Sequence, residues 1–140
     1  MSLQDRLASV LGEFLALTRE EDGAITVHHD GTIASLRVVD IAEGLELISL
    51  TQILAWDLPL DAKLRAAVAD HAHNTLLGTV SLAAKSGHKE VAAGAKKNSK
   101  KAADVLLRYN FPAAGLTDDA LRTLILMVLA TGSDVRRALI

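Results

Sequence analysis

Cysteine is absent from the 140 residues of the chain, and aromatic residues make up only 3% of them. Without thiols the protein can form no disulfide, no thiolate nucleophile and no Cys-ligated zinc site, which agrees with a reducing compartment. Half of the residues are hydrophobic. Because so few of these are aromatic, the core must be built from Leu, Val, Ile and Ala. A chain of this length is expected to fold as one domain, residues 1–140, without disulfides or metals.

Long apolar runs and targeting signals are also absent. The longest apolar stretch, residues 124–130, is far shorter than the ~20 residues that a helix needs to cross a bilayer. Residues 1–6 show no basic region followed by an apolar run. We therefore expect a soluble, cytoplasmic protein without a membrane partner.

The common catalytic motifs are missing as well. The sequence contains no Gly-x-Ser-x-Gly elbow, no His-Glu-x-x-His helix and no Gly-x-Gly-x-x-Gly loop. Its neighbouring carboxylates, Glu43 with Glu46 and Asp118 with Asp119, fall at a predicted turn and a predicted helix start, where capping and solubility explain them. We predict that the protein is not an enzyme, has no catalytic residues and uses no cofactor.

The histidines do not form a convincing metal site. His28 and His29 are adjacent in a predicted strand and so face opposite sides of it. His71 and His73 lie about 200° apart on a predicted helix, although they would share a face if that stretch were a strand. Asp70 is placed to pair with His73 on the helix surface. We predict no metal ligands.

The first half of the chain reads as a helix followed by three strands. Apolar residues recur at three- and four-residue spacing from Leu3 to Leu15, and the helix is expected to run to a stop at Asp22-Gly23. Asp30-Gly31 is a strong two-residue hairpin signal, because both positions tolerate positive φ. The predicted antiparallel meander has strands at residues 25–28, 32–41 and 45–56, the last bent near Gln52.

The second half reads as a helix, two strands and a helix. Asp61 is predicted to be the N-cap of a helix that ends near Asn74. Thr117 is expected to cap the final helix, in which Gly132 marks either the end or a break before residues 135–140. The two strands between these helices are predicted at residues 76–84 and 105–111. The fold class is therefore α+β, with three helices on one five-stranded antiparallel sheet, in the order α-β-β-β-α-β-β-α.

This order of elements resembles that of a known family. The likeness is carried by residues 74–82, by residues 104–112 with their terminal Asn-Phe-Pro, by Gly115-Leu116 and by the helix over 118–128. The chain resembles the YbjN family of proposed bacterial sensory-transduction regulators, which has a type III secretion chaperone-like fold. The resemblance implies a non-enzymatic and often dimeric protein that handles other polypeptides or modulates stress responses.

Lysine is concentrated between Lys85 and Lys101. This segment contains six lysines and only one acidic residue, in a chain whose net charge is −2. We expect a long, mobile loop there. A cationic loop on an acidic body suggests binding of nucleic acid or another anionic ligand, with Lys96, Lys97, Lys100 and Lys101 as the anion-binding residues. The segment has neither Arg nor an aromatic residue to stack on bases, so we favour a loop kept soluble by its charge.

Apolar residues on both faces of the third strand give the stronger lead. In an antiparallel sheet with one solvent-exposed face, apolar and polar residues alternate more regularly along each strand. Here, therefore, either helices cover both faces or one face meets a partner. Leu47 and Trp56 are the candidate partner-binding residues, although Trp56 is as readily a core residue. We predict a homodimeric, chaperone-like or regulatory module that binds a polypeptide, and keep anion binding through residues 85–101 as the alternative.

Overall fold

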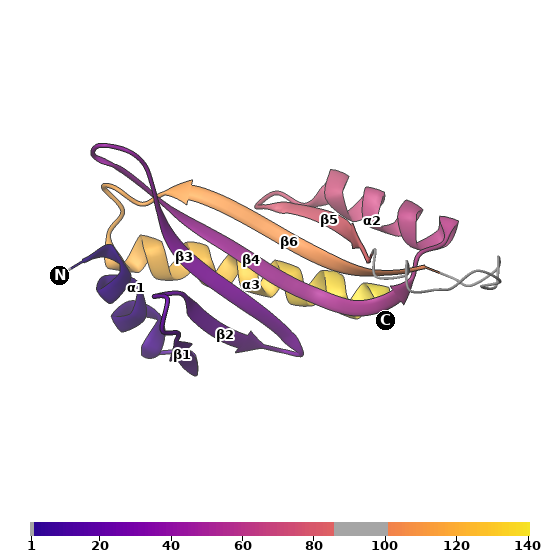
Figure 1. Cartoon of the computed structure of the whole chain (residues 1–140), viewed down its shortest axis with the longest axis horizontal. Coiled ribbons are helices and arrows are strands. Elements are labelled where there is room, and N and C mark those ends of the chain that lie inside the picture. Colours follow the sequence, from indigo (N-terminus) through magenta and orange to yellow (C-terminus); the bar gives the residue numbers. More distant parts are fainter. Residues whose placement is uncertain (1, 86–100) are drawn as a thin grey trace, which may run out of the picture.

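The computed structural model describes residues 2–85 and 101–140 and contains a six-stranded antiparallel sheet with three helices (Figure 1). The strand order is β1-β2-β3-β4-β6-β5. The elements are α1 (Leu3–Gly12), β1 (Leu17–Arg19), β2 (Ile25–His29), β3 (Thr32–Ala42), β4 (Leu45–Pro59), α2 (Ala62–Asn74), β5 (Thr79–Ala84), β6 (Ala102–Pro112) and α3 (Asp118–Leu139). The predicted α+β class and the predicted three helices are confirmed.

The sheet has six strands rather than the predicted five, because the first helix ends early. Helix α1 stops at Gly12 instead of running to Asp22-Gly23, and Leu17–Arg19 pairs with β2 as the edge strand β1. The helical pattern breaks physically at Phe14, whose side chain is 58% exposed. From Leu15 to Leu17 half-buried and exposed residues alternate, and Leu17 lies opposite Val27 in the sheet.

The hairpin between β2 and β3 has the predicted turn. Asp30 and Gly31 adopt φ values of 45° and 84°, the left-handed backbone that a two-residue turn of this kind needs. Strand β4 is irregular just after the predicted bend at Gln52, with the register shifting between Ile53 and Ala55 and again before Leu58. The strand runs three residues beyond its predicted end at residue 56 and stops at Pro59, which has no backbone N–H to donate to a neighbouring strand.

Side-chain caps begin the second and third helices where the sequence places them. Oδ1 of Asp61 accepts from the backbone N–H of Leu64 at 2.8 Å, and Oγ1 of Thr117 accepts from that of Ala120 at 3.0 Å. The expected break at Gly132 does not occur, since α3 runs through it to Leu139. Strand β5 begins at Thr79, three residues later than predicted.

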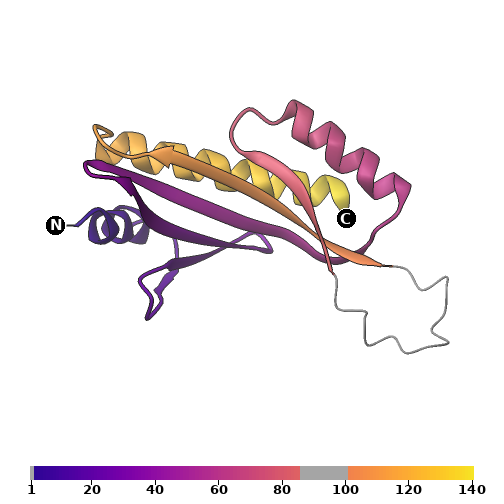
Figure 2. The same cartoon turned by 45° about the horizontal axis from the view of Figure 1, so that its top comes forward.

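The helices and the sheet enclose the core on one side of the sheet. Helix α3 lies along that face, with α1 beside its beginning and α2 packed against β5, and the sheet twists across them (Figure 2). The core joins residues from all three helices to the inward side chains of the sheet, among them Leu7, Leu64 and Leu129. No helix within residues 2–85 and 101–140 is long and apolar enough to cross a membrane.

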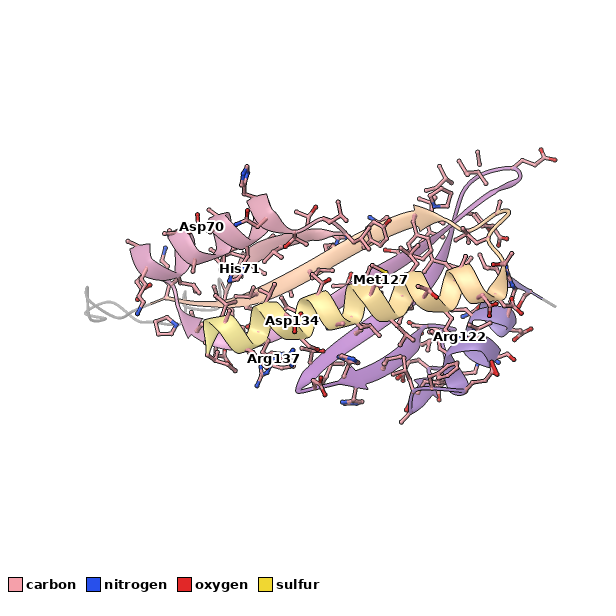
Figure 3. All side chains as sticks on the ribbon, turned by 180° about the vertical axis from the view of Figure 1, so that it is seen from behind. Asp70, His71, Arg122, Met127, Asp134 and Arg137 are labelled. Atoms are coloured by element: carbon pink, nitrogen blue, oxygen red, sulfur yellow. The ribbon has the colours of Figure 1, made fainter. Side chains whose placement is uncertain are left out.

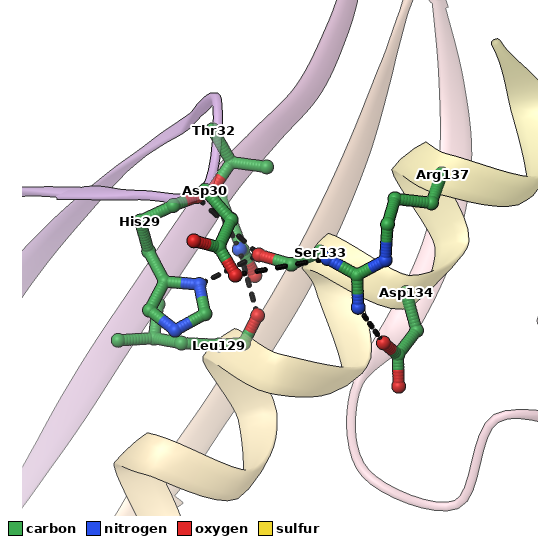
Figure 4. Close-up of polar contacts among 8 residues, drawn as sticks. His29, Asp30, Thr32, Leu129, Ser133, Asp134 and Arg137 are labelled. Carbon is green, nitrogen blue, oxygen red and sulfur yellow. Dashed lines mark hydrogen bonds and ion pairs between the residues drawn. The ribbon is translucent and has the colours of Figure 1, made fainter.

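A buried polar contact joins α3 to the sheet. The side chain of Gln52 is fully buried, and its Nε2 donates to Oγ1 of Thr32 at 2.8 Å and to the carbonyl oxygen of Leu129 at 3.1 Å. Nδ1 of His29 lies 2.6 Å from Oγ of Ser133, and the two side chains point toward each other (Figure 4). These contacts hold the helix against the hairpin of β2 and β3.

Candidate partner-binding face

The sheet face opposite the helices is covered by no element in the described part of the chain. We call it the open face. Strand β4 shows the two sides clearly, because its even-numbered residues from Ile48 to Leu54 are fully buried and the odd-numbered residues between them are partly exposed. Figure 1 views the open face with α3 behind the strands, and Figure 3 views the helices from the other side.

Three neighbouring strands place twelve side chains on this face in register. We call these residues the central patch. Each residue of β3 lies opposite one of β4, and that residue lies opposite one of β6. The four rows across the sheet are Ile33–Ile53–Leu106, Ser35–Thr51–Arg108, Arg37–Ser49–Asn110 and Val39–Leu47–Pro112. The outer two rows are apolar and the inner two are polar. None of the twelve residues is buried.

The central patch carries two positive charges and no carboxylate. Arg37 and Arg108 are both exposed and occupy the two inner rows. Arg37 donates to Oδ2 of Asp22 at 2.7 Å, in an ion pair whose two side chains are about half exposed. Arg108 has no ion pair with any residue of the described ranges. Exposed ion pairs contribute roughly 0–1 kcal/mol, so Asp22 holds the side chain of Arg37 only weakly.

Leu47 and Trp56, the predicted partner-binding residues, lie far apart on this face. Leu47 is a half-buried member of an outer row of the central patch. Leu54 and Ala55 are both buried where the register shifts, and the next residue, Trp56, is 36% exposed beyond the other outer row. The structure therefore does not bring these two residues into one contact, and Trp56 is not a core residue.

Lys85 pairs with two carboxylates at the end of the sheet near Trp56. Its Nζ lies 2.5 Å from Oδ1 of Asp57 and 3.4 Å from Oδ1 of Asp104, and the backbone N–H of Asp57 donates to that same Asp104 oxygen at 3.0 Å. The hydrogen bond to Asp57, followed by that to Asp104, raises the pKa of the Lys85 ammonium above its ordinary value. The charge of Lys85 is thus already balanced by the protein.

The predicted anion-binding residues fall mostly outside the described part of the chain. Lys96, Lys97 and Lys100 lie in residues 86–100. Lys101 is described and exposed, and its carbonyl oxygen accepts from the backbone N–H of Leu60 at 2.9 Å. Anion binding by these lysines stays a prediction, as does the expected loop.

The histidines are placed as the sequence suggested. His28 is exposed, whereas the neighbouring His29 contacts Ser133 of α3, so the two face opposite sides of β2. His71 and His73 lie on α2, and no group of three metal-ligating side chains occurs among the described residues. The His29–Ser133 pair is no accessible nucleophile, because Ser133 is only 1% exposed and sits in the helix–sheet contact.

A second apolar surface lies at the tip of the hairpin formed by β3 and β4. Val39, Ile41 and Leu45 are between 38% and 56% exposed there. This part of β3 pairs with β4 on one side, whereas its pairing with β2 ends at Leu36. The hairpin consequently projects beyond the neighbouring strands (Figure 1).

Sequence reasoning missed both arginines of the central patch. The alternation of β3 and β6 suggests which residues share a face, but the rows depend on how the two strands align with β4. That alignment was the missing signal.

A solved structure has a similar fold. A crystal structure of YbjN from E. coli, described as a proposed transcription regulator, superposes with a TM-score of 0.58 over 94% of this chain and 87% of the YbjN chain. The sequence identity is 13%, so the similarity concerns the fold. No family model and no curated protein matches the sequence. The likeness to YbjN expected from the sequence is confirmed as a likeness of fold; the relation to type III secretion chaperones stays a prediction.

Proposed function

We propose that this chain is a non-enzymatic binding module of the regulatory or chaperone-like kind, which holds a polypeptide against the open face of its sheet. The observation that carries the proposal is the central patch, where partly exposed apolar rows flank a polar centre on a face that no described helix covers. Sheets in soluble proteins normally pack such apolar rows against another layer. Leu47 and Trp56 lie on this face, as the partner-binding prediction requires.

We further propose that the protein acts as a homodimer through the hairpin tip. Ile41 and Leu45 form an exposed apolar surface that lies beyond the twelve residues of the central patch. An association through this tip leaves the polar centre of each open face available for a polypeptide. The cytoplasmic location predicted from the sequence stays a prediction.

Site-specific photocrosslinking in the cell of origin tests the binding module. A photoreactive amino acid replaces Ser49, which is half-buried at the centre of the patch, and a matched variant carries it at Arg65, which is exposed on α2. We expect polypeptide adducts from position 49 that resist nuclease and are absent from position 65. Equal adducts at both positions, or only nuclease-sensitive adducts, would contradict the proposal.

A further inference from the structure

The dimensions of the central patch match those of one helix. From Ile53 to Leu47 the patch spans six residue steps along β4, or about 20 Å at the usual rise of a strand. Across its three strands it is about 10 Å wide. A helix is about 10 Å in diameter, and about 13 residues of it cover 20 Å.

The order of the rows fixes the chemistry of that helix. Its two ends meet Val39, Leu47 and Pro112 in one outer row and Ile33, Ile53 and Leu106 in the other, so both ends must be apolar. Its middle meets two rows of hydroxyl and amide groups that contain Arg37 and Arg108 and no carboxylate.

The charges argue against several other occupants. A second copy of this sheet face would bring four guanidinium groups together, with one carboxylate in each copy, the Asp22 paired with Arg37, to offset them. A wholly apolar helix would desolvate the guanidinium of Arg108 without a partner and would bury the Arg37–Asp22 ion pair, and both are costly. A helix with carboxylates in its middle instead gives each arginine a charge-assisted hydrogen bond.

We propose that the open face binds an amphipathic helix of about 13 residues that has apolar residues at both ends and carboxylates in its central turns. This inference rests on the proposed function and names its partner class. Arg37 and Arg108 select the acidic centre, and the two apolar rows set the spacing of the anchors. In the bound state the Asp22–Arg37 ion pair gives way to a carboxylate of the partner.

A displayed peptide library tests the preference directly. Helical peptides of about 15 residues carry leucines in their first and last turns, and all amino acids are allowed at the central positions. The library is selected on the wild-type protein, on the variant Arg37→Gln with Arg108→Gln, and on a control, Lys63→Gln with Arg65→Gln, that removes two exposed positive charges of α2.

We expect Asp and Glu to be enriched about tenfold over Asn and Gln at the centre on the wild type and the control, and not on the patch variant. Peptides that bind the face without an acidic preference overturn the inference but leave the binding module standing. If no peptide binds, or if binding survives Ile53→Thr and Leu106→Thr, the inference and the proposed binding module are both overturned. Binding of a single-stranded oligonucleotide that depends on both arginines and excludes the peptides overturns the inference in favour of nucleic acid.

Discussion

Gly132 of α3 lies against the side chain of Gln52 of β4, so closely that a Cβ atom on the glycine would overlap the Gln52 carboxamide. This explains why a glycine stands within α3, although glycine usually weakens helices. The helix approaches the sheet here, and the absent side chain makes room for the amide that donates to Thr32 and to the Leu129 carbonyl. Oε1 of Gln52 is buried and has no hydrogen-bond partner among the described residues.

Replacing this glycine tests the close approach. Alanine favours a helix over glycine by about 1 kcal/mol, but forcing the buried amide aside costs about 1–3 kcal/mol. We expect Gly132→Ala to lower the free energy of unfolding, as measured by urea denaturation. The control Ala130→Gly, at an exposed position of the same helix, measures how much the helix prefers alanine to glycine. In a Gln52→Ala background the Gly132→Ala change should become stabilising. A stabilising effect in the wild-type background would show instead that the Gln52 side chain moves aside at little cost.

The carboxyl group of Asp22 should make the folding stability depend on pH. The backbone N–H of Ala24, followed by the guanidinium of Arg37, lowers the pKa of the Asp22 carboxyl below its ordinary value of 3.8. Because the folded state binds the proton less readily than the unfolded state, the stabilisation is complete above the ordinary pKa and is lost as pH falls through the folded pKa.

We therefore expect Asp22→Ala to be less stable than the wild type near pH 7, and this difference to shrink below about pH 4. Urea unfolding across this range measures both. The matched variant Asp22→Asn keeps an oxygen that can accept from Ala24, so its loss near neutral pH should be smaller. A difference that stays constant into strong acid would mean that the carboxylate charge contributes nothing.

The hairpin tip should control association. Ile41 is 56% exposed and Leu45 is 39% exposed, so changing both to serine removes apolar surface without opening a cavity. We expect the wild type to sediment at twice the 14.8 kDa mass of the chain and the double variant at the chain mass, with little change in unfolding. Leu76→Ser, at an 89% exposed residue near β5, serves as the control. A monomeric wild type at micromolar concentrations would rule out the proposed dimer.

Local signals made much of the fold predictable. Asp30-Gly31 and the caps Asp61 and Thr117 each act within a few residues, so sequence reasoning placed them correctly. Strand β1 was missed because three residues carry no periodicity, and only their pairing with β2 makes them a strand. Gly132 was misjudged because its reason is a contact with β4, far away in the sequence.

The candidate site was predictable only in part. Apolar residues on both sides of β4 indicated a face that needs a partner, and Leu47 was named on that basis. Arg37 and Arg108 come from strands that flank β4, and their rows follow from the registers of β3 and β6 against it. Hydrophobic periodicity assigns a residue to a face but does not align neighbouring strands, so the central patch could not be assembled from the sequence.

Thiol labelling measures the occupancy of the open face most directly, because the chain has no cysteine of its own. A single cysteine at Thr51 lies at the centre of the patch, and one at Arg65 on exposed α2 serves as the reference. The alkylation rate of each is measured in the purified protein and in intact cells. The account predicts that the rate at position 51, relative to position 65, falls several-fold in cells; an unchanged ratio would contradict a polypeptide bound to this face.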